Sequence, residues 1–206
     1  MKLYTGLGPN PKVVHIFLAE KGMDVSEIQV DLMAGENREA SHLSRNPSGQ
    51  LPTLELDDGS FLAEITAICE YLDEVGPAPT LIGSDPQERA ETRMWTRRID
   101  LQITEPLATA FRGSEGHGLF KDRIRTFPQA ADDLKLHAQE RLEWLDGQID
   151  GKEFICGDRL TLADILLFPF LEFGGAVGQP LDPKLERLHG WYNRMAARPS
   201  VGDTQR

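Results

Sequence analysis

The sequence has few cysteines, an excess of acidic over basic residues and no long apolar run. Only two cysteines occur in 206 residues, Cys69 and Cys156, and they form no Cys-x-x-Cys pair. This usage disfavours a disulfide framework and a zinc site, and it favours a reducing compartment such as the cytoplasm. The first residues read directly as a strand and lack the pattern of a signal peptide.

Positive charge is also scarce, because 22 Lys and Arg stand against 33 Asp and Glu, a net charge of −11. Nucleic acid is therefore disfavoured as a partner. The most apolar stretch, 160–173, is interrupted by Asp164, Pro169 and Glu172. It is too short to cross a bilayer and predicts a buried helix. For the same reason we expect no membrane partner. The five histidines show no ligand spacing, so we expect no metal either.

The first third of the chain alternates strand and helix signals. A strand at 2–5 is followed by Asn10-Pro11, which suit the N-cap and the first position of a helix that Gly22 ends. A second strand is expected at 25–30, which gives a βαβ unit with parallel strands. The segment 36–44 is polar and predicts a short helix.

The segment 46–55 (NPSGQLPTLE) is the most informative stretch. Residues 46–49 form a turn cluster, and Pro52 begins an apolar run, where the Leu51–Pro52 bond is a candidate for the cis isomer. Asp58-Gly59 predicts a hairpin between 54–56 and 61–62, and Glu64 begins a helix at 64–73. The resulting βαβαββα order predicts a thioredoxin-like arrangement with one mixed sheet.

Strand signals stop after the linker-like sequence GPAP at 76–79. Long helices are expected at 85–110, with a kink or an end at Pro106, and at 129–149. Thr161 and Asp164 form a variant of the capping box, the last clear helix is 184–197, and the tail after Pro199 is expected to be loose. The predicted fold class is α+β, with a thioredoxin-like domain (1–77), a linker (78–86) and an all-helical domain (87–206).

These features together resemble the glutathione S-transferase family. The resemblance lies in the Asn-Pro-x-Gly-x-x-Pro stretch at 46–52, in the acidic Glu64 and in GDRLTLAD at 157–164. The sequence ETRMWTRR at 91–98 is similar to a bacterial branch, and the likeness extends over essentially the whole chain. It implies glutathione as a co-substrate, a small electrophile as the second substrate, and a homodimer.

The resemblance also assigns a glutathione-binding site. The Leu51 backbone, beside a cis Pro52, would pair with the cysteinyl part of glutathione, and Gln50 resembles the residue that reaches the glycine carboxylate. As alternatives, Leu51 would be an ordinary edge strand and Gln50 inert surface.

At the other end of the tripeptide, Glu64 would bind the ammonium of the γ-glutamyl group. The backbone N–H groups of Ile65 and Thr66, at a helix N-terminus, would hold its carboxylate. Most relatives have serine where this chain has Ile65, so that hydroxyl contact is lost, and whether the Thr66 hydroxyl replaces it stays open. The alternative for Glu64 is a favourable acidic residue near a helix start.

The residue that activates the thiol is the weakest part of the match. The family's tyrosine, serine or cysteine is missing from 5–10, which reads TGLGPN. Gly8-Pro9-Asn10 is similar to the Thr-Pro-Asn of Nu-type transferases, so Asn10 is the first candidate and Thr5 the second. A plain N-cap and a strand end are the respective alternatives.

Three functions remain open on this sequence. The first is transfer of the glutathione thiolate to small apolar electrophiles. The second, suggested by the Nu-like segment, is glutathione-dependent disulfide reduction. The third is a non-catalytic binding or regulatory module that keeps the fold, since fold alone does not settle function.

Overall fold

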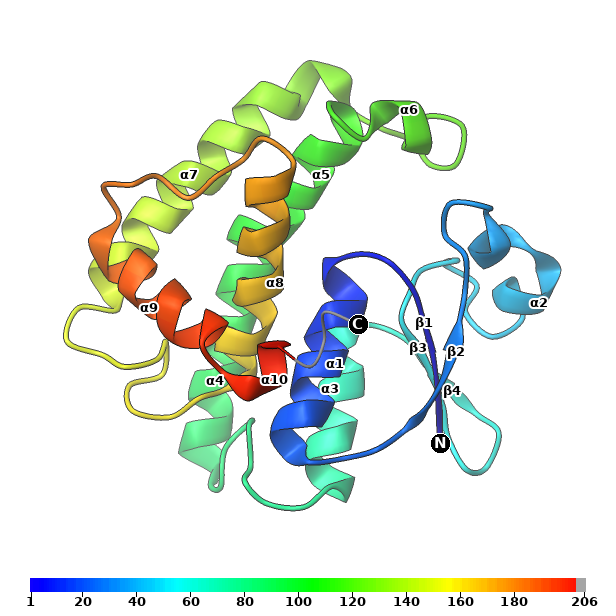
Figure 1. Cartoon of the computed structure of the whole chain (residues 1–206), viewed down its shortest axis with the longest axis horizontal. Helices are drawn as coiled ribbons and strands as arrows, with labels where there is room; N and C mark the ends of the chain where they lie inside the picture. The colour runs from blue at the N-terminus through cyan, green and yellow to red at the C-terminus, as the bar shows by residue number, and fades with distance from the viewer. Residues whose placement is uncertain (203–206) are drawn as a thin grey trace. The chain divides into compact units, whose positions relative to one another are not determined.

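The structure, a computed structural model, describes residues 1–202 (Figure 1). The described chain divides into two compact units, 1–82 together with 199–202, and 83–198. Residues 78–82 of the predicted linker belong to the first unit, and so do residues 199–202. No helix within residues 1–202 combines the length and apolar composition that a membrane span requires.

The first unit is a four-stranded mixed sheet covered by helices. The strand order is β2-β1-β3-β4, with β1 parallel to β2 and antiparallel to β3. Helices α1 and α3 lie together against one side of the sheet, and α2 lies on the other (Figure 1). In chain order the elements are β1 (Lys2–Thr5), α1 (Pro9–Lys21), β2 (Ser26–Gln29), a 3-10 turn (Glu36–Arg38), α2 (Ala40–Leu43), β3 (Thr53–Glu55), β4 (Phe61–Leu62) and α3 (Ile65–Val75).

This order confirms the predicted βαβαββα arrangement, with one correction at the start of α1. The helix begins at Pro9 with Gly8 as its N-cap, so Asn10 lies inside the first turn and is not the N-cap. Gly8 has a φ of 127°, which a side chain would disfavour, and Pro9 fits the first helical position. The predicted end is confirmed, because Gly22 is left-handed and its N–H donates to the Ala19 carbonyl.

The second unit is all-helical. Its first helix, α4 (Pro86–Ile99), is capped by the Asp85 side chain and continues through a π-helical turn (Asp100–Thr104) into α5 (Glu105–Gly113). The π turn ends at Thr104, two residues before Pro106, which lacks an N–H, so the chain accommodates this proline without ending the helix. The remaining elements are α6 (His117–Phe120), a 3-10 turn (Pro128–Ala130), α7 (Ala131–Gln148), α8 (Leu162–Ala176) and α9 (Glu186–Ala196).

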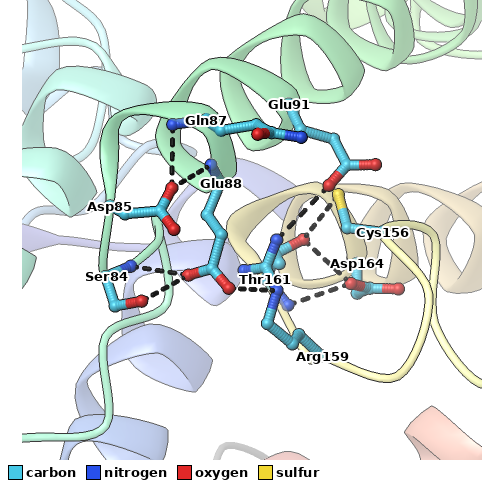
Figure 2. A network of polar contacts seen from close by, with 9 residues as sticks. All are labelled: Ser84, Asp85, Gln87, Glu88, Glu91, Cys156, Arg159, Thr161 and Asp164. Carbon is cyan, nitrogen blue, oxygen red and sulfur yellow. Dashed lines mark hydrogen bonds and ion pairs between the residues drawn. The ribbon is translucent and has the colours of Figure 1, made fainter.

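The loop before α8 is fastened to α4 by ion pairs (Figure 2). Arg159 lies 3.3 Å from a Glu88 oxygen and 3.4 Å from a Glu91 oxygen. The nearby Cys156 thiol is nearly buried, and burial raises its pKa to about 11. Arg159 therefore serves the packing of the second unit, and Cys156 is a poor nucleophile at neutral pH.

The expectation of a loose tail after Pro199 is corrected for residues 199–202, and the rest of that tail, 203–206, lies outside the described residues. Pro199–Gly202 forms a short helix, α10, in which Ser200 and Val201 are buried. The Ser200 hydroxyl donates to a carboxylate oxygen of Glu20 in α1. Residues 199–202 thus belong to the packing of the first unit and not of the helical domain, where the sequence had placed them.

Candidate functional site

The loop from Asn46 to Thr53 is fixed by one buried asparagine. The Asn46 Oδ1 accepts hydrogen bonds from the Ser48 N–H (3.1 Å) and from the Ser48 hydroxyl (2.7 Å). Its Nδ2 donates to the Gln50 carbonyl (3.0 Å) and to the Thr53 hydroxyl (3.2 Å). Because both ends of the amide are used, four hydrogen bonds stabilise the turn that leads to Leu51.

The Leu51–Pro52 peptide bond is cis, as the sequence suggested. The Leu51 side chain is buried with Tyr4 and Val30. Gly6 packs against it so closely that a Cβ there would lie 2.7 Å from the Val30 carbonyl oxygen and 3.0 Å from a Leu51 methyl carbon. The loop after β1 thus lies beside Leu51. Neither the N–H nor the C=O of Leu51 forms a hydrogen bond within residues 1–202.

Glu64 has an unusual backbone. Its φ is 69°, and it is the one non-glycine residue of positive φ in the described chain. Such a conformation costs on the order of 1–3 kcal/mol, and it persists only where the surroundings impose it. The side chain is exposed, and it makes no hydrogen bond or ion pair with any described residue. The fold therefore imposes a strained backbone on the N-cap residue of α3, whose carboxylate has no partner among the described residues.

The first turn of α3 supplies donors next to that carboxylate. The first hydrogen bond of the helix runs from the Ile68 N–H to the Glu64 carbonyl (2.9 Å). The N–H groups of Ile65 and Thr66 precede it, so they have no partner within the helix. Gln50 is exposed, and it too is available to a ligand.

The two candidates for thiol activation are placed differently. Thr5 is fully buried, and its hydroxyl lies 3.0 Å from His15 Nε2, so it is directed into the protein. His15 Nε2 is also 3.3 Å from a Glu27 oxygen, and burial lowers the pKa of this histidine. Asn10 is half-buried in the first turn of α1. Of the two, Asn10 has the more accessible side chain.

A hollow of about 500 Å³ lies along α1 and β2 and includes His15 and Glu27. Leu51 and Glu64 are not part of its wall, which carries both charge signs through residues such as Lys12 and Asp24. Because both Thr5 and Glu27 contact the same nitrogen of His15, these residues do not form a nucleophilic triad. The hollow is therefore set aside, and the candidate site residues are Leu51, with its free backbone groups, and Glu64, with the donors that follow it.

Comparison with known proteins decides the family. The family model of the glutathione S-transferase N-terminal domain matches residues 1–74, and that of the C-terminal domain matches residues 110–199. The chain belongs to the glutathione S-transferase family. The predicted family and the two-part fold are thereby confirmed.

Individual relatives of this glutathione S-transferase family member cover nearly its whole length. It is 35% identical to Glutathione S-transferase 2 of Saccharomyces cerevisiae over 96% of this chain and 85% of the yeast protein. It is 32% identical to GstA of Escherichia coli O157:H7, over 98% and 96%. The crystal structure of a glutathione S-transferase domain-containing protein from Marinobacter aquaeolei VT8 superposes with a TM-score of 0.92 at 37% identity, covering 98% of this chain and 100% of that one.

Proposed function

We propose that this protein transfers the thiolate of glutathione to small apolar electrophiles. The observation that carries the proposal is the strained Glu64, whose exposed carboxylate has no partner in the described chain. Family membership indicates glutathione as the ligand that this carboxylate meets. In the reaction the sulfur forms a bond to an electrophilic carbon, the leaving group departs with its electron pair, and the thiol proton passes to solvent.

Each part of glutathione has a counterpart at the site. The γ-glutamyl ammonium pairs with Glu64, and its carboxylate accepts from the N–H groups of Ile65 and Thr66. The cysteinyl backbone pairs with the free N–H and C=O of Leu51 in the manner of an added strand. Gln50 contacts the glycine carboxylate. The loss of the family's serine at Ile65 leaves two N–H donors for the γ-glutamyl carboxylate.

Asn10 is the proposed activator of the thiol. A thiol of pKa about 8.5 must be lowered by roughly one to two units to ionise at neutral pH, which requires about 1.4–2.7 kcal/mol. One hydrogen bond from the Asn10 amide and the positive end of the α1 dipole supply a stabilisation of this size. Catalysis then consists mainly of proximity and thiolate stabilisation.

Changing Glu64 to glutamine should weaken glutathione binding by roughly 10- to 100-fold, because a hydrogen-bonded charge contact contributes about 1.5–3 kcal/mol. Glutamine keeps the size and the backbone of the site and removes only the charge. Isothermal calorimetry with reduced glutathione measures the loss. Glu74→Gln is the matched control, since Glu74 is exposed near the other end of α3. Equal affinity in wild type and Glu64→Gln would refute the ammonium contact.

Changing Asn10 to alanine should raise the pKa of the bound thiol by about one unit, the size of one lost hydrogen bond to a charged group. Ultraviolet titration of the thiolate in the complex measures this pKa. In the wild type the thiolate should persist at neutral pH, whereas in the variant it should be lost as the pH falls through about 8. An unchanged titration would remove Asn10 from the mechanism.

Assays with different substrates distinguish transfer from the two alternatives, glutathione-dependent disulfide reduction and a non-catalytic module. Turnover of an aryl halide indicates transfer, and turnover of hydroxyethyl disulfide indicates glutathione-dependent reduction. The family alone does not decide the activity, because one relative at 34% identity is named Maleylacetoacetate isomerase. Tight binding of glutathione with no turnover would favour a non-catalytic module.

The proposal includes a homodimer acting in the cytoplasm. Exposed apolar side chains occur on α4, on the π turn and on α7, at Met94, Leu101 and Leu136, and would be covered in a symmetric contact. Cys69 and Cys156 are both free thiols, as a reducing compartment maintains them. A monomer in sedimentation velocity would exclude the dimer.

A further inference from the structure

The backbone carbonyl of Gln50, the residue before Leu51, accepts hydrogen bonds from buried side chains of the first unit. It accepts hydrogen bonds from His42 Nε2 (3.0 Å) and from Asn46 Nδ2 (3.0 Å), and the Thr53 hydroxyl lies 3.5 Å away. His42 projects from α2 and is 1% exposed. A residue whose own side chain is exposed thus has its backbone oxygen held inside the protein.

The hydrogen on His42 is located by its partner. Since a carbonyl oxygen can only accept, Nε2 of His42 carries the hydrogen. Nδ1 is then the buried acceptor, and no described residue donates to it. Burying an unpaired nitrogen costs free energy that a phenylalanine in the same space would avoid. Packing alone does not explain a histidine here, whereas the hydrogen bond to Gln50 does.

The same bond orients the residue that meets the ligand. The Gln50 C=O and the Leu51 N–H belong to one trans peptide group, so they point in opposite directions. With the oxygen held inward by His42 and Asn46, the Leu51 N–H is turned away from them, and no described group accepts from it. Without these two hydrogen bonds the Gln50–Leu51 peptide group would be free to rotate, and the Leu51 N–H would no longer have a fixed orientation.

We propose that His42 is a positioning residue for glutathione. It acts through the Gln50 carbonyl, with Asn46 as the second donor, to aim the Leu51 N–H at the cysteinyl part of the tripeptide. His42 does not touch the ligand. The inference rests on the proposed function, because it presumes that glutathione pairs with the Leu51 backbone.

The test compares glutathione affinity among variants of the full chain. His42→Phe keeps a ring and removes the donor, so the Kd of glutathione should rise about five- to tenfold, the equivalent of one hydrogen bond. His42→Gln places an amide nitrogen near the position of Nε2 and should restore the affinity, whereas the shorter His42→Asn should not. His189→Phe is the matched control, because His189 Nε2 makes the same kind of bond to the Asp182 carbonyl (3.1 Å) in the second unit.

Restored affinity in His42→Gln would distinguish a role in positioning the Leu51 N–H from a general loss of stability. If His42→Phe does not fold, the comparison of glutamine with asparagine decides, since both bury one amide. With an aryl halide as probe, the KM of glutathione should rise while the KM of the halide stays unchanged. Wild-type affinity in His42→Phe, or equal affinity of the glutamine and asparagine variants, overturns the role of His42 alone. A wild-type chain that does not bind glutathione overturns the proposed function, and this inference with it.

Discussion

Replacing Asp164 by alanine is expected to lower the free energy of unfolding by about 3–5 kcal/mol, because several buried donors lose their acceptor together. Oδ1 accepts from the Trp191 indole N–H (2.8 Å) and from the Ile155 N–H (2.9 Å). Oδ2 accepts from the Thr161 N–H (3.0 Å), and the Thr161 hydroxyl lies 3.1 Å away (Figure 2). Asp164 has no exposed surface. The alanine would leave these donors unpaired beside a cavity.

Asparagine should rescue Asp164 only in part. An amide presents one oxygen and one NH₂, so one pair of donors would face a donor. Burial raises the pKa of the Asp164 carboxyl, and its hydrogen bonds act in the opposite direction. The carboxyl thus tolerates burial because each of its oxygens has two partners.

Urea unfolding followed by tryptophan fluorescence measures the loss in Asp164→Ala. Asp133→Ala is the control, since Asp133 is an exposed acidic residue in the first turn of α7 and its removal should cost under about 1 kcal/mol. A loss in Asp164→Ala no larger than in this control would show that the four contacts do not hold the second unit together.

Asp164 was also among the features that the sequence could predict. The capping box at Thr161 and Asp164 is a local pattern, since its partners are three residues apart. The order of strands and helices along the chain and the cis Leu51–Pro52 bond were predictable for the same reason, because turns, prolines and periodicity act over a few residues. The Asp164 contacts with Trp191 and Ile155 were not, because they join distant segments.

The site was less predictable than the fold. Sequence placed Glu64 at a helix start, but it gave no sign of the positive φ, because glutamate has no preference for that region and the fold imposes it. At α1, both Pro9 and Pro11 suit an early helical position, and the conformation of Gly8 selected Pro9. Burial of the Thr5 hydroxyl against His15 depended on packing across the β1–α1 connection. His42 carried no signal, since its partner is a backbone carbonyl.

The burial of Lys21 was also not predicted from the sequence, and its removal is expected to lower the stability of the protein strongly. The side chain of Lys21 has no exposed surface, and that of Asp73 is 7% exposed. Lys21 Nζ lies 3.0 Å from Asp73 Oδ1 and donates to the Pro79 carbonyl (2.8 Å). Asp73 also accepts from the N–H groups of Leu81 (2.8 Å) and Ile82 (3.2 Å). This buried pair ties α1 and α3 to the segment that ends the first unit.

Changing Lys21 to methionine should therefore lower the free energy of unfolding by about 3–5 kcal/mol, because a buried carboxylate would lose its counter-charge. The apolar stem of the lysine is preserved, so the loss reports the charge and not a cavity. The double change Lys21→Met with Asp73→Leu should recover part of the loss, since it removes both buried charges. Lys184→Met is the control, as Lys184 is exposed.

Urea unfolding of the wild type, Lys21→Met, Asp73→Leu and the double variant gives the coupling energy between Lys21 and Asp73. The same variants should release 79–82 from the first unit, which would make the backbone N–H groups of Leu81 and Ile82 exchange faster with solvent because they donate to Asp73. A Lys21→Met chain as stable as the Lys184→Met control, with unchanged exchange at these two amides, would show that the buried pair does not anchor the end of this unit.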